Sequence, residues 1–357
     1  SSPDGRYEIV YHHHNLVLLE HDTGMERTLT EDGESHYGYG AYSDFMSIGI
    51  YEHQALPLNV QWSADGRYLA VQRIDERQVA IMPLQQCVPE EGDLRPINKP
   101  YKLAMTGDDN VVLALLCIID IESGDIIVSD RPPVPASGGG FADLDALCWG
   151  SDNRVYHTEW TRDRQVVRLV AFDATTRTTH VLIEEIHQGN AHAPVHPGPM
   201  PFEITIFRVL PEINAFIWYS HRSGWGHLYH YDLTTGELKN AVTSGDFVVT
   251  ELHHVDTNKR CLYFSAGGRE PDRNPYYEHL YRVNLDGSDL VLLTPENCQH
   301  DIVPPRFMTE ERQLAANIHG VSPNGTVFID TQSRVDQPPR SVLRSTLDGT
   351  ELMELSQ

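Results

Sequence analysis

A short polar turn recurs along this chain and constrains its fold more than any other feature. Residues 2–7 read SPDGRY, and residues 63–68 read SADGRY. Asp and Gly are turn-forming residues, and alternating β-forming residues follow each copy. Less complete copies of the turn lie at residues 151–156, 256–260 and 322–326. A phrase that returns in this way predicts a repeat architecture.

A second repeated element is a β-hairpin. Each copy has an alternating strand, a turn that usually contains Asp, Thr or Gly, and a second alternating strand, which is a hairpin pattern. The copies lie at residues 16–30, 116–130, 169–183, 228–242, 280–294 and 342–355. Most follow one another at intervals of roughly 50 to 60 residues, as blades of a radial repeat do. We expect one further, degenerate unit around residues 62–84, in the wide gap between the first two copies.

These repeats predict an all-β protein, a β-propeller of seven to eight blades with four antiparallel strands in each. A β-sandwich is the main rival, but it would not repeat the same turn so regularly. We expect residues 1–357 to form a single propeller domain. Because the chain begins within a repeat, we also expect it to lack an upstream blade and to be part of a longer protein.

Composition restricts the partners. The chain has 51 acidic and 27 basic residues, a formal net charge of −24, so neither nucleic acid nor an anionic membrane is expected to bind it. No apolar run approaches the roughly 18 residues of a membrane span. The five cysteines form no C-x-x-C pair, which argues against a zinc ribbon or a redox motif. A cytoplasmic or periplasmic bacterial location fits as well as secretion, so the location stays open.

The sequence offers little chemistry of its own. No G-x-S-x-G nucleophile elbow occurs, so we predict no catalytic residue in the chain and leave its status as an enzyme open. No phosphate-binding or dinucleotide-binding motif occurs, so we expect no cofactor. His187, His192 and His196 share one Pro-rich segment and could converge on a metal ion. Without a carboxylate partner a surface loop is the favoured interpretation, and no metal site is predicted.

Several longer stretches resemble one peptidase family. Residues 62–76, WSADGRYLAVQRIDE, are similar to the W-S-P-D-G-x-x-x-A…R-x-D-E stretch of the dipeptidyl peptidase IV propeller. Residues 220–232, 243–251 and 333–339 resemble later blades of that propeller, in the same order. The chain therefore resembles the N-terminal β-propeller domain of the dipeptidyl peptidase IV and prolyl oligopeptidase family of serine peptidases.

This resemblance implies a non-catalytic propeller that admits substrates to a C-terminal α/β-hydrolase domain carrying a Ser-Asp-His triad. That domain would lie beyond Gln357 in the parent chain, which would hydrolyse peptides. The implied partners are the hydrolase domain, a peptide substrate and a second copy in a homodimer. One alternative is a stand-alone propeller that serves as a protein-binding platform, and another is a lyase or hydrolase with a His-rich metal site.

The resemblance also suggests where a substrate binds. In the family, two adjacent Glu of a D-W-x-x-E-E segment hold the N-terminal amine of the peptide through charge-assisted hydrogen bonds. The corresponding residues 43–52, SDFMSIGIYE, lack this pair, and Asp44 and Glu52 are the nearest carboxylates. We therefore predict that Asp44 and Glu52 bind substrate. The departure leaves open whether the parent is a dipeptidyl peptidase, an oligopeptidase or an aminopeptidase with a different register.

Overall fold

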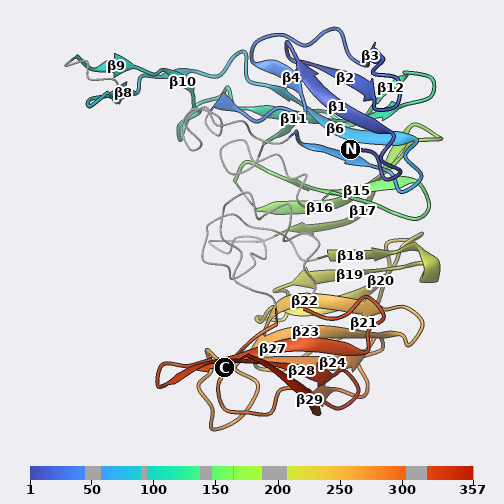
Figure 1. Ribbon diagram of the computed structural model, residues 1–357, viewed down its shortest axis with the longest axis vertical. Coiled ribbons are helices and arrows are strands. Elements are labelled where there is room, and N and C mark those ends of the chain that lie inside the picture. Colours follow the sequence, from blue (N-terminus) through green and yellow to red (C-terminus); the bar gives the residue numbers. More distant parts are fainter. Residues whose placement is uncertain are drawn as a thin grey trace. The chain divides into compact units, whose positions relative to one another are not determined.

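The computed structural model describes residues 1–44, 58–89, 95–136, 147–163, 165–186, 207–302 and 320–356. The chain divides into two compact units, Ser1–Ala193 and Pro194–Gln357 (Figure 1). The named elements of the described residues are β-strands and one 3-10 helix, η3 (Pro211–Ile213). No helix in these residues is long and apolar enough to cross a membrane. The prediction of an all-β chain is confirmed.

The second unit contains three antiparallel sheets, each of four strands that pair in chain order. The first comprises β18 (Phe207–Leu210), β19 (Ala215–Ser220), β20 (His227–Asp232) and β21 (Leu238–Ala241). The second comprises β22 (Val248–Asp256), β23 (Cys261–Gly267), β24 (Glu278–Asn284) and β25 (Val291–Leu292). The third comprises β26 (Gln299–Asp301), β27 (Val327–Arg334), β28 (Gln337–Ser345) and β29 (Glu351–Ser356). Four sequential antiparallel strands are the pattern of a propeller blade.

The first unit also contains three larger sheets. One comprises β1 (Tyr7–His12), β2 (Asn15–Glu20) and β3 (Glu26–Thr28), and another comprises β14 (Cys148–Trp149), β15 (Arg154–Trp160), β16 (Val166–Asp173) and β17 (Thr178–Ile186). The sheet between them in sequence has six strands, β4 (Tyr37–Tyr39), β5 (Val60–Trp62), β6 (Tyr68–Asp75), β11 (Leu113–Asp120), β12 (Ile126–Val128) and β13 (Val134–Pro135).

The six-stranded sheet corrects one expectation. Strand β6 pairs with β11 along its whole length, from Tyr68 opposite Asp120 to Asp75 opposite Leu113. Residues 62–84 therefore contribute strands to the same sheet as residues 116–130, and the prediction of a separate degenerate unit was wrong. The wide gap in the repeats reflects an insertion between two paired strands, residues 76–112, and not an additional blade.

The insertion carries a narrow arm of two short ladders. Strand β7 (Ile81–Met82) pairs with β10 (Tyr101–Lys102), and β8 (Gln85–Gln86) pairs with β9 (Ile97–Asn98). Figure 1 shows β8, β9 and β10 extending away from the sheets of the first unit. Such two-stranded ribbons are marginal in isolation, so the paired ends of β6 and β11 are what anchor the arm.

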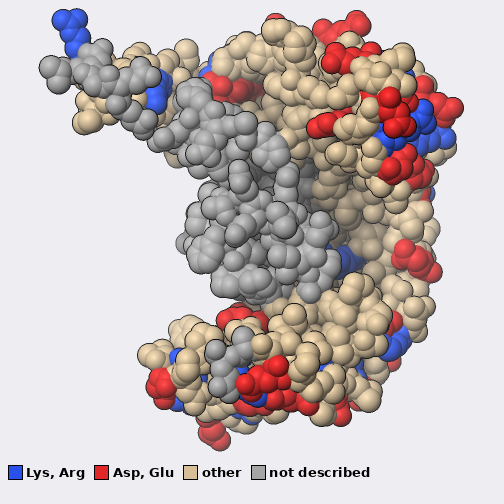
Figure 2. Space-filling model, in the orientation of Figure 1, with Lys and Arg blue, Asp and Glu red and all other residues tan. Residues whose placement is uncertain are grey.

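The described residues thus supply six blade-like sheets, and the propeller class is confirmed. A total of seven to eight blades in a single domain, with one blade upstream, stays a prediction. Asp and Glu are exposed on both units, with fewer Lys and Arg among them (Figure 2), as the net charge requires.

The recurring turn has a definite physical basis. The Ser2 hydroxyl donates to the Asp4 carboxylate at 2.6 Å and accepts the Tyr7 N–H at 2.9 Å. The copy at residues 63–68 repeats both hydrogen bonds, at 2.5 and 2.9 Å. In each copy the glycine has a positive φ, near 70°, which glycine adopts without strain. The turn thereby fixes the start of β1 and of β6.

Candidate functional site

The predicted substrate-binding residue Asp44 lies in a cluster of polar side chains in the first unit. Its backbone N–H donates to both carboxylate oxygens of Glu76, at 3.1 Å each. Its own Oδ2 accepts the backbone N–H of Lys102 at 3.1 Å and lies 3.4 Å from Nδ1 of His36. Asp44 therefore contacts three places: the residue before β4, the residue after β6, and the arm.

The pairing of β4 with β6 explains why these residues meet. Tyr37 lies opposite Asp75 in this ladder, so His36, which precedes β4, lies beside Glu76, which follows β6. Nδ1 of His36 is 3.4 Å from Oε1 of Glu76. Strand β10 of the arm brings Lys102 to the same place. Lys102 pairs with Ile81 at the start of β7, and its Nζ contacts the carbonyl groups of residues 77 and 79, just after β6.

The cluster combines two carboxylates with little compensating charge. Glu76 is only 4 % exposed, and burial together with the neighbouring Asp44 raises the pKa of Glu76 to about 8. The ammonium of Lys102 does not hydrogen-bond to either carboxylate, since its Nζ donates to the carbonyl oxygens of Arg77 and Val79 at 2.9 and 3.0 Å. His36, Asp44 and Glu76 each place one potential metal-ligand atom within 4.8 Å of the other two.

The other candidate residues from the sequence lie outside the part of the chain that the structure describes. Glu52 lies outside the described residues, so its role in substrate binding stays a prediction. His187, His192 and His196 also lie outside them. The sequence does not single out His36, and it shows Glu76 only as part of the R-x-D-E stretch. A charged residue directly after a buried alternating strand was the available signal for Glu76.

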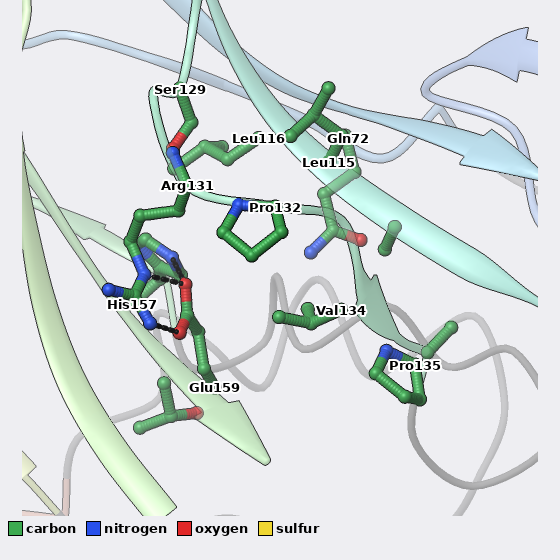
Figure 3. A pocket seen from close by; sticks show the side chains of 13 residues that line it. Gln72, Leu115, Leu116, Ser129, Arg131, Pro132, Val134, Pro135, His157 and Glu159 are labelled. Atoms are coloured by element: carbon green, nitrogen blue, oxygen red, sulfur yellow. Dashed lines mark hydrogen bonds and ion pairs between the residues drawn. The ribbon is translucent and has the colours of Figure 1, made fainter. Parts of the chain in front are cut away.

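A pocket opens on the same six-stranded sheet, toward β15 (Figure 3). It contains roughly 420 Å³ of unfilled space, part of it open to solvent. On one side Arg131 donates to both oxygens of Glu159, at 2.7 and 2.5 Å, and His157 Nε2 lies 3.5 Å from the same carboxylate. Burial favours a higher pKa for Glu159, but hydrogen bonds from His157 and Arg131 outweigh it and lower the pKa to about 2. This ion pair therefore remains charged at neutral pH.

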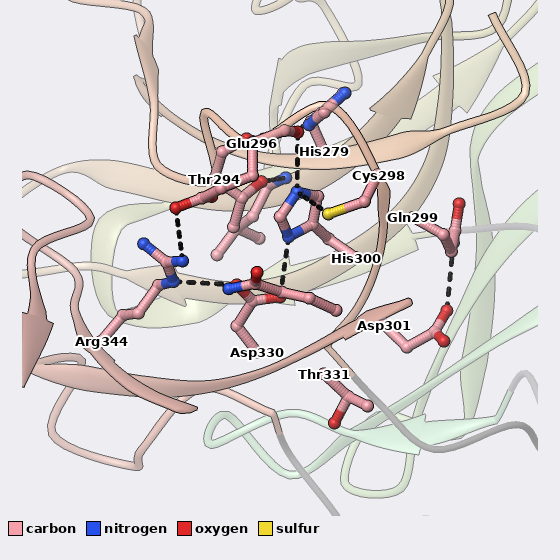
Figure 4. A network of polar contacts seen from close by, with 12 residues as sticks. His279, Thr294, Glu296, Cys298, Gln299, His300, Asp301, Asp330, Thr331 and Arg344 are labelled. Carbon is pink, nitrogen blue, oxygen red and sulfur yellow. Dashed lines mark hydrogen bonds and ion pairs between the residues drawn. The ribbon is translucent and has the colours of Figure 1, made fainter. Parts of the chain in front are cut away.

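A second polar cluster lies in the second unit, and its His300, Asp330 and Arg344 side chains are buried (Figure 4). Nδ1 of His300 donates to Asp330 at 2.9 Å, and Arg344 donates to Asp330 and Glu296 at 2.8 Å each. Burial favours a lower pKa for His300, but the hydrogen bonds to Asp330 and Cys298 outweigh it and raise the pKa to about 10. The chain of alternating charges fastens β26 to β27 and β28.

The buried cluster is not arranged for catalysis. Cys298 Sγ lies 3.5 Å from Nε2 of His300, which suggests a nucleophile and its base. However, the protonated Nε2 also donates to the backbone carbonyl of Glu296 at 3.1 Å, and Nδ1 donates to Asp330, so neither ring nitrogen is available to accept a proton. Every charged group of the cluster has a partner of opposite charge, so its role is structural.

Comparison with known proteins places the chain in a family. The N-terminal region of dipeptidyl peptidase IV (DPP IV) matches residues 1–339. The chain belongs to this family. The dipeptidyl peptidase 4 of Porphyromonas gingivalis has the same fold, with a TM-score of 0.68 and 19 % sequence identity over 99 % of this chain and 44 % of that one.

Two curated proteins similar to this DPP IV N-terminal region come from fungi. "Probable dipeptidyl-aminopeptidase B" of Talaromyces marneffei is 26 % identical over 319 residues, covering 82 % of this chain and 33 % of that protein. Dipeptidyl-aminopeptidase B of Aspergillus niger is 24 % identical over 324 residues, covering 82 % and 34 %. The chain spans about one third of the length of these relatives. A bacterial source remains a prediction.

Proposed function

We propose that this DPP IV N-terminal region is the non-catalytic, substrate-gating propeller of a serine peptidase and takes part in peptide hydrolysis by its parent protein. The match of the DPP IV N-terminal region to residues 1–339 carries this proposal. The absence of a G-x-S-x-G elbow from the 357 residues supports it, because the nucleophile must then come from another part of the parent. The proposed partner is a C-terminal α/β-hydrolase domain, which would contribute that nucleophile.

We propose further that Asp44 and Glu52 bind the N-terminal ammonium group of the peptide. The side chain of Asp44 is 20 % exposed, and its carboxylate has no Lys or Arg as an ion-pair partner among the described residues. A carboxylate in that condition favours a cationic ligand, because a charge-assisted hydrogen bond is stronger than a neutral one. The net charge of −24 would also attract cationic peptide ends toward the propeller.

Two measurements on the full-length protein test this function. A fluorophosphonate probe should label a serine outside residues 1–357, and labelling of a serine within them would refute the assignment. In the second measurement, Asp44→Asn should raise KM for peptides with a free N-terminus by about tenfold, the loss of one charge-assisted hydrogen bond. KM for N-acetylated peptides should not change. An equal effect on both kinds of peptide would remove Asp44 from amine recognition.

The arm is the surface that we propose for a homodimer. Ile81 is 66 % exposed and Ile97 is 43 % exposed, and Leu84 and Val88 are exposed on the same arm. Apolar side chains gathered on a projecting ribbon favour burial against another protein surface.

The alternative function is a stand-alone propeller that serves as a protein-binding platform, and it would use the same arm. The mass of the full-length protein distinguishes this platform from the gating propeller of a peptidase. A mass close to that of the 357 residues alone would favour the platform.

A further inference from the structure

We propose that His36, Asp44 and Glu76 bind one divalent transition-metal ion of the Zn²⁺ type, with three protein ligands and one water molecule. This inference goes beyond the gating function and does not rest on it. It depends on three features of the cluster: the distances between the ligand atoms, the lack of a compensating cation, and the hydrogen bonds that orient the carboxylates.

The distances between ligand atoms suit a tetrahedral ion. Nδ1 of His36 lies 3.4 Å from Oδ2 of Asp44 and 3.4 Å from Oε1 of Glu76, and the three atoms lie within 4.8 Å of one another. Zinc binds nitrogen and oxygen ligands at about 2.0–2.1 Å, so the atoms at two corners of its tetrahedron are separated by about 3.3–3.4 Å. Two of the three edges already have this length. An ion can therefore enter with little movement of the side chains.

The cluster also lacks the positive charge that its burial demands. Glu76 is 4 % exposed, and no Lys or Arg of the described residues forms an ion pair with its carboxylate or with that of Asp44. The ammonium of Lys102 is turned toward two backbone carbonyl groups. Burial without a cation disfavours the charged form of a carboxyl group. One divalent ion would balance the two carboxylates and leave His36 as a neutral ligand.

In the buried cluster of the second unit, an arginine balances the charge of the carboxylates. Glu296, His300 and Asp330 have the same residue types and also lie within 4.8 Å of one another. There, however, the guanidinium of Arg344 pairs with both carboxylates at 2.8 Å, and His300 hydrogen-bonds directly to Asp330 at 2.9 Å. The cluster around Asp44 has no counterpart of Arg344 among the described residues.

Backbone hydrogen bonds hold the two carboxylates in place. The Lys102 N–H donates to Asp44, and the Asp44 N–H donates to Glu76. Carboxylate ligands of metal ions are usually oriented by such outer hydrogen bonds. A bound ion would connect Asp44 to the ends of β4 and β6. It would also neutralise the Asp44 carboxylate, so an ion and a peptide ammonium would compete for that residue.

Metal binding can be measured without any peptide. The full-length protein is stripped with a chelator and titrated with ZnCl₂ in a calorimeter, and Co²⁺ serves as a spectroscopic probe because its visible bands are strong only in a four-coordinate site. We expect wild type to bind one more Zn²⁺ than the His36→Ala and Asp44→Asn variants, and we expect those variants to lose the strong Co²⁺ bands.

A matched control separates the site from other histidines. His21 lies 3.9 Å from Glu8 in an exposed pair, so His21→Ala removes the same residue type and should leave the zinc stoichiometry and the Co²⁺ bands unchanged. Circular dichroism should show the same β-structure in all variants; His36 is partly exposed, so its removal should not prevent folding. Equal zinc stoichiometry in wild type and His36→Ala, or weak octahedral Co²⁺ bands in wild type, would overturn the proposal. Neither result would affect the test of the peptide amine.

Discussion

The backbone N–H of Asp44 donates to both carboxylate oxygens of Glu76, at 3.1 Å each, although the two residues are 32 positions apart. Glu76 is buried at the end of β6, whereas Asp44 is partly exposed and precedes residues 45–57. A rigid sheet thereby fixes the position of the carboxylate that we propose as a ligand-binding group. This relationship makes Glu76 a positioning residue as well as a proposed metal ligand.

Removing the Glu76 carboxylate should cost stability. We expect Glu76→Ala to lower the free energy of unfolding by about 1–3 kcal/mol at pH 4.5, because the Asp44 N–H would lose its acceptor while Glu76, whose pKa is raised from 4.5 to about 8, carries no buried charge at that pH. Urea unfolding of the stripped full-length protein measures this change. Glu26 is an exposed residue of β3, so Glu26→Ala is the control and should change stability by no more than about 0.5 kcal/mol. Equal effects of the two substitutions would show that the Glu76 contact contributes little.

The buried network around Asp330 should be far more sensitive. Asp330→Ala would leave His300 and Arg344 buried without their shared carboxylate, and we expect a loss of about 3–5 kcal/mol. The control is Asp336→Ala, which removes an exposed carboxylate paired with Arg334 and should cost less than about 1 kcal/mol. Thermal unfolding compares the two variants. A small loss of stability in Asp330→Ala would mean that the Asp330 carboxylate does not stabilise the charges of His300 and Arg344 as the distances imply.

The same network predicts how stability depends on pH. The pKa of His300 is raised from 6.5 to about 10 in the folded chain. A raised pKa contributes stability that is fully present below pH 6.5 and is lost as pH rises toward 10, because the unfolded chain releases its proton first. Wild type should therefore lose stability relative to His300→Gln between pH 6.5 and 10. Parallel stability curves over that range would show that His300 is not protonated in the folded state.

The arm gives a prediction about assembly. Replacing Ile81 and Ile97 with Asp would introduce charge on the exposed apolar ribbon, and we expect this double variant to be monomeric where wild type is dimeric. Sedimentation of the full-length protein measures the assembly state. Met25 is an equally exposed apolar residue away from the arm, so Met25→Asp should leave the dimer intact. A dimer that survives the double substitution must use another surface.

Whether the sequence predicts a given part of this structure depends on how far apart along the chain the interacting residues lie. The Ser-x-Asp-Gly turn uses hydrogen bonds between residues at most five apart, so the local sequence predicts both the turn and the strand that follows it. The pairing of β6 with β11 spans the insertion of residues 76–112, and no local pattern could show that the two strands belong to one sheet.

The site illustrates the same limit. Asp44 was predicted from a family resemblance, but His36 and Glu76 come beside it only because β4 pairs with the end of β6. Neither residue carries a spacing motif that would indicate a shared site. The sequence likewise showed that Lys102 is basic, but it could not show that the ammonium is turned toward backbone carbonyl groups.

The position of the insertion has a consequence for how this propeller can vary. The chain leaves the sheet after Asp75 and returns at Leu113, which is its direct partner across the ladder. Closing a longer loop between two such fixed points costs only about 0.6 kcal/mol for each doubling of its length. The insertion can therefore be lengthened, shortened or replaced while the register between β6 and β11 is preserved. Proteins that share these blades are free to differ in the molecules that the insertion contacts.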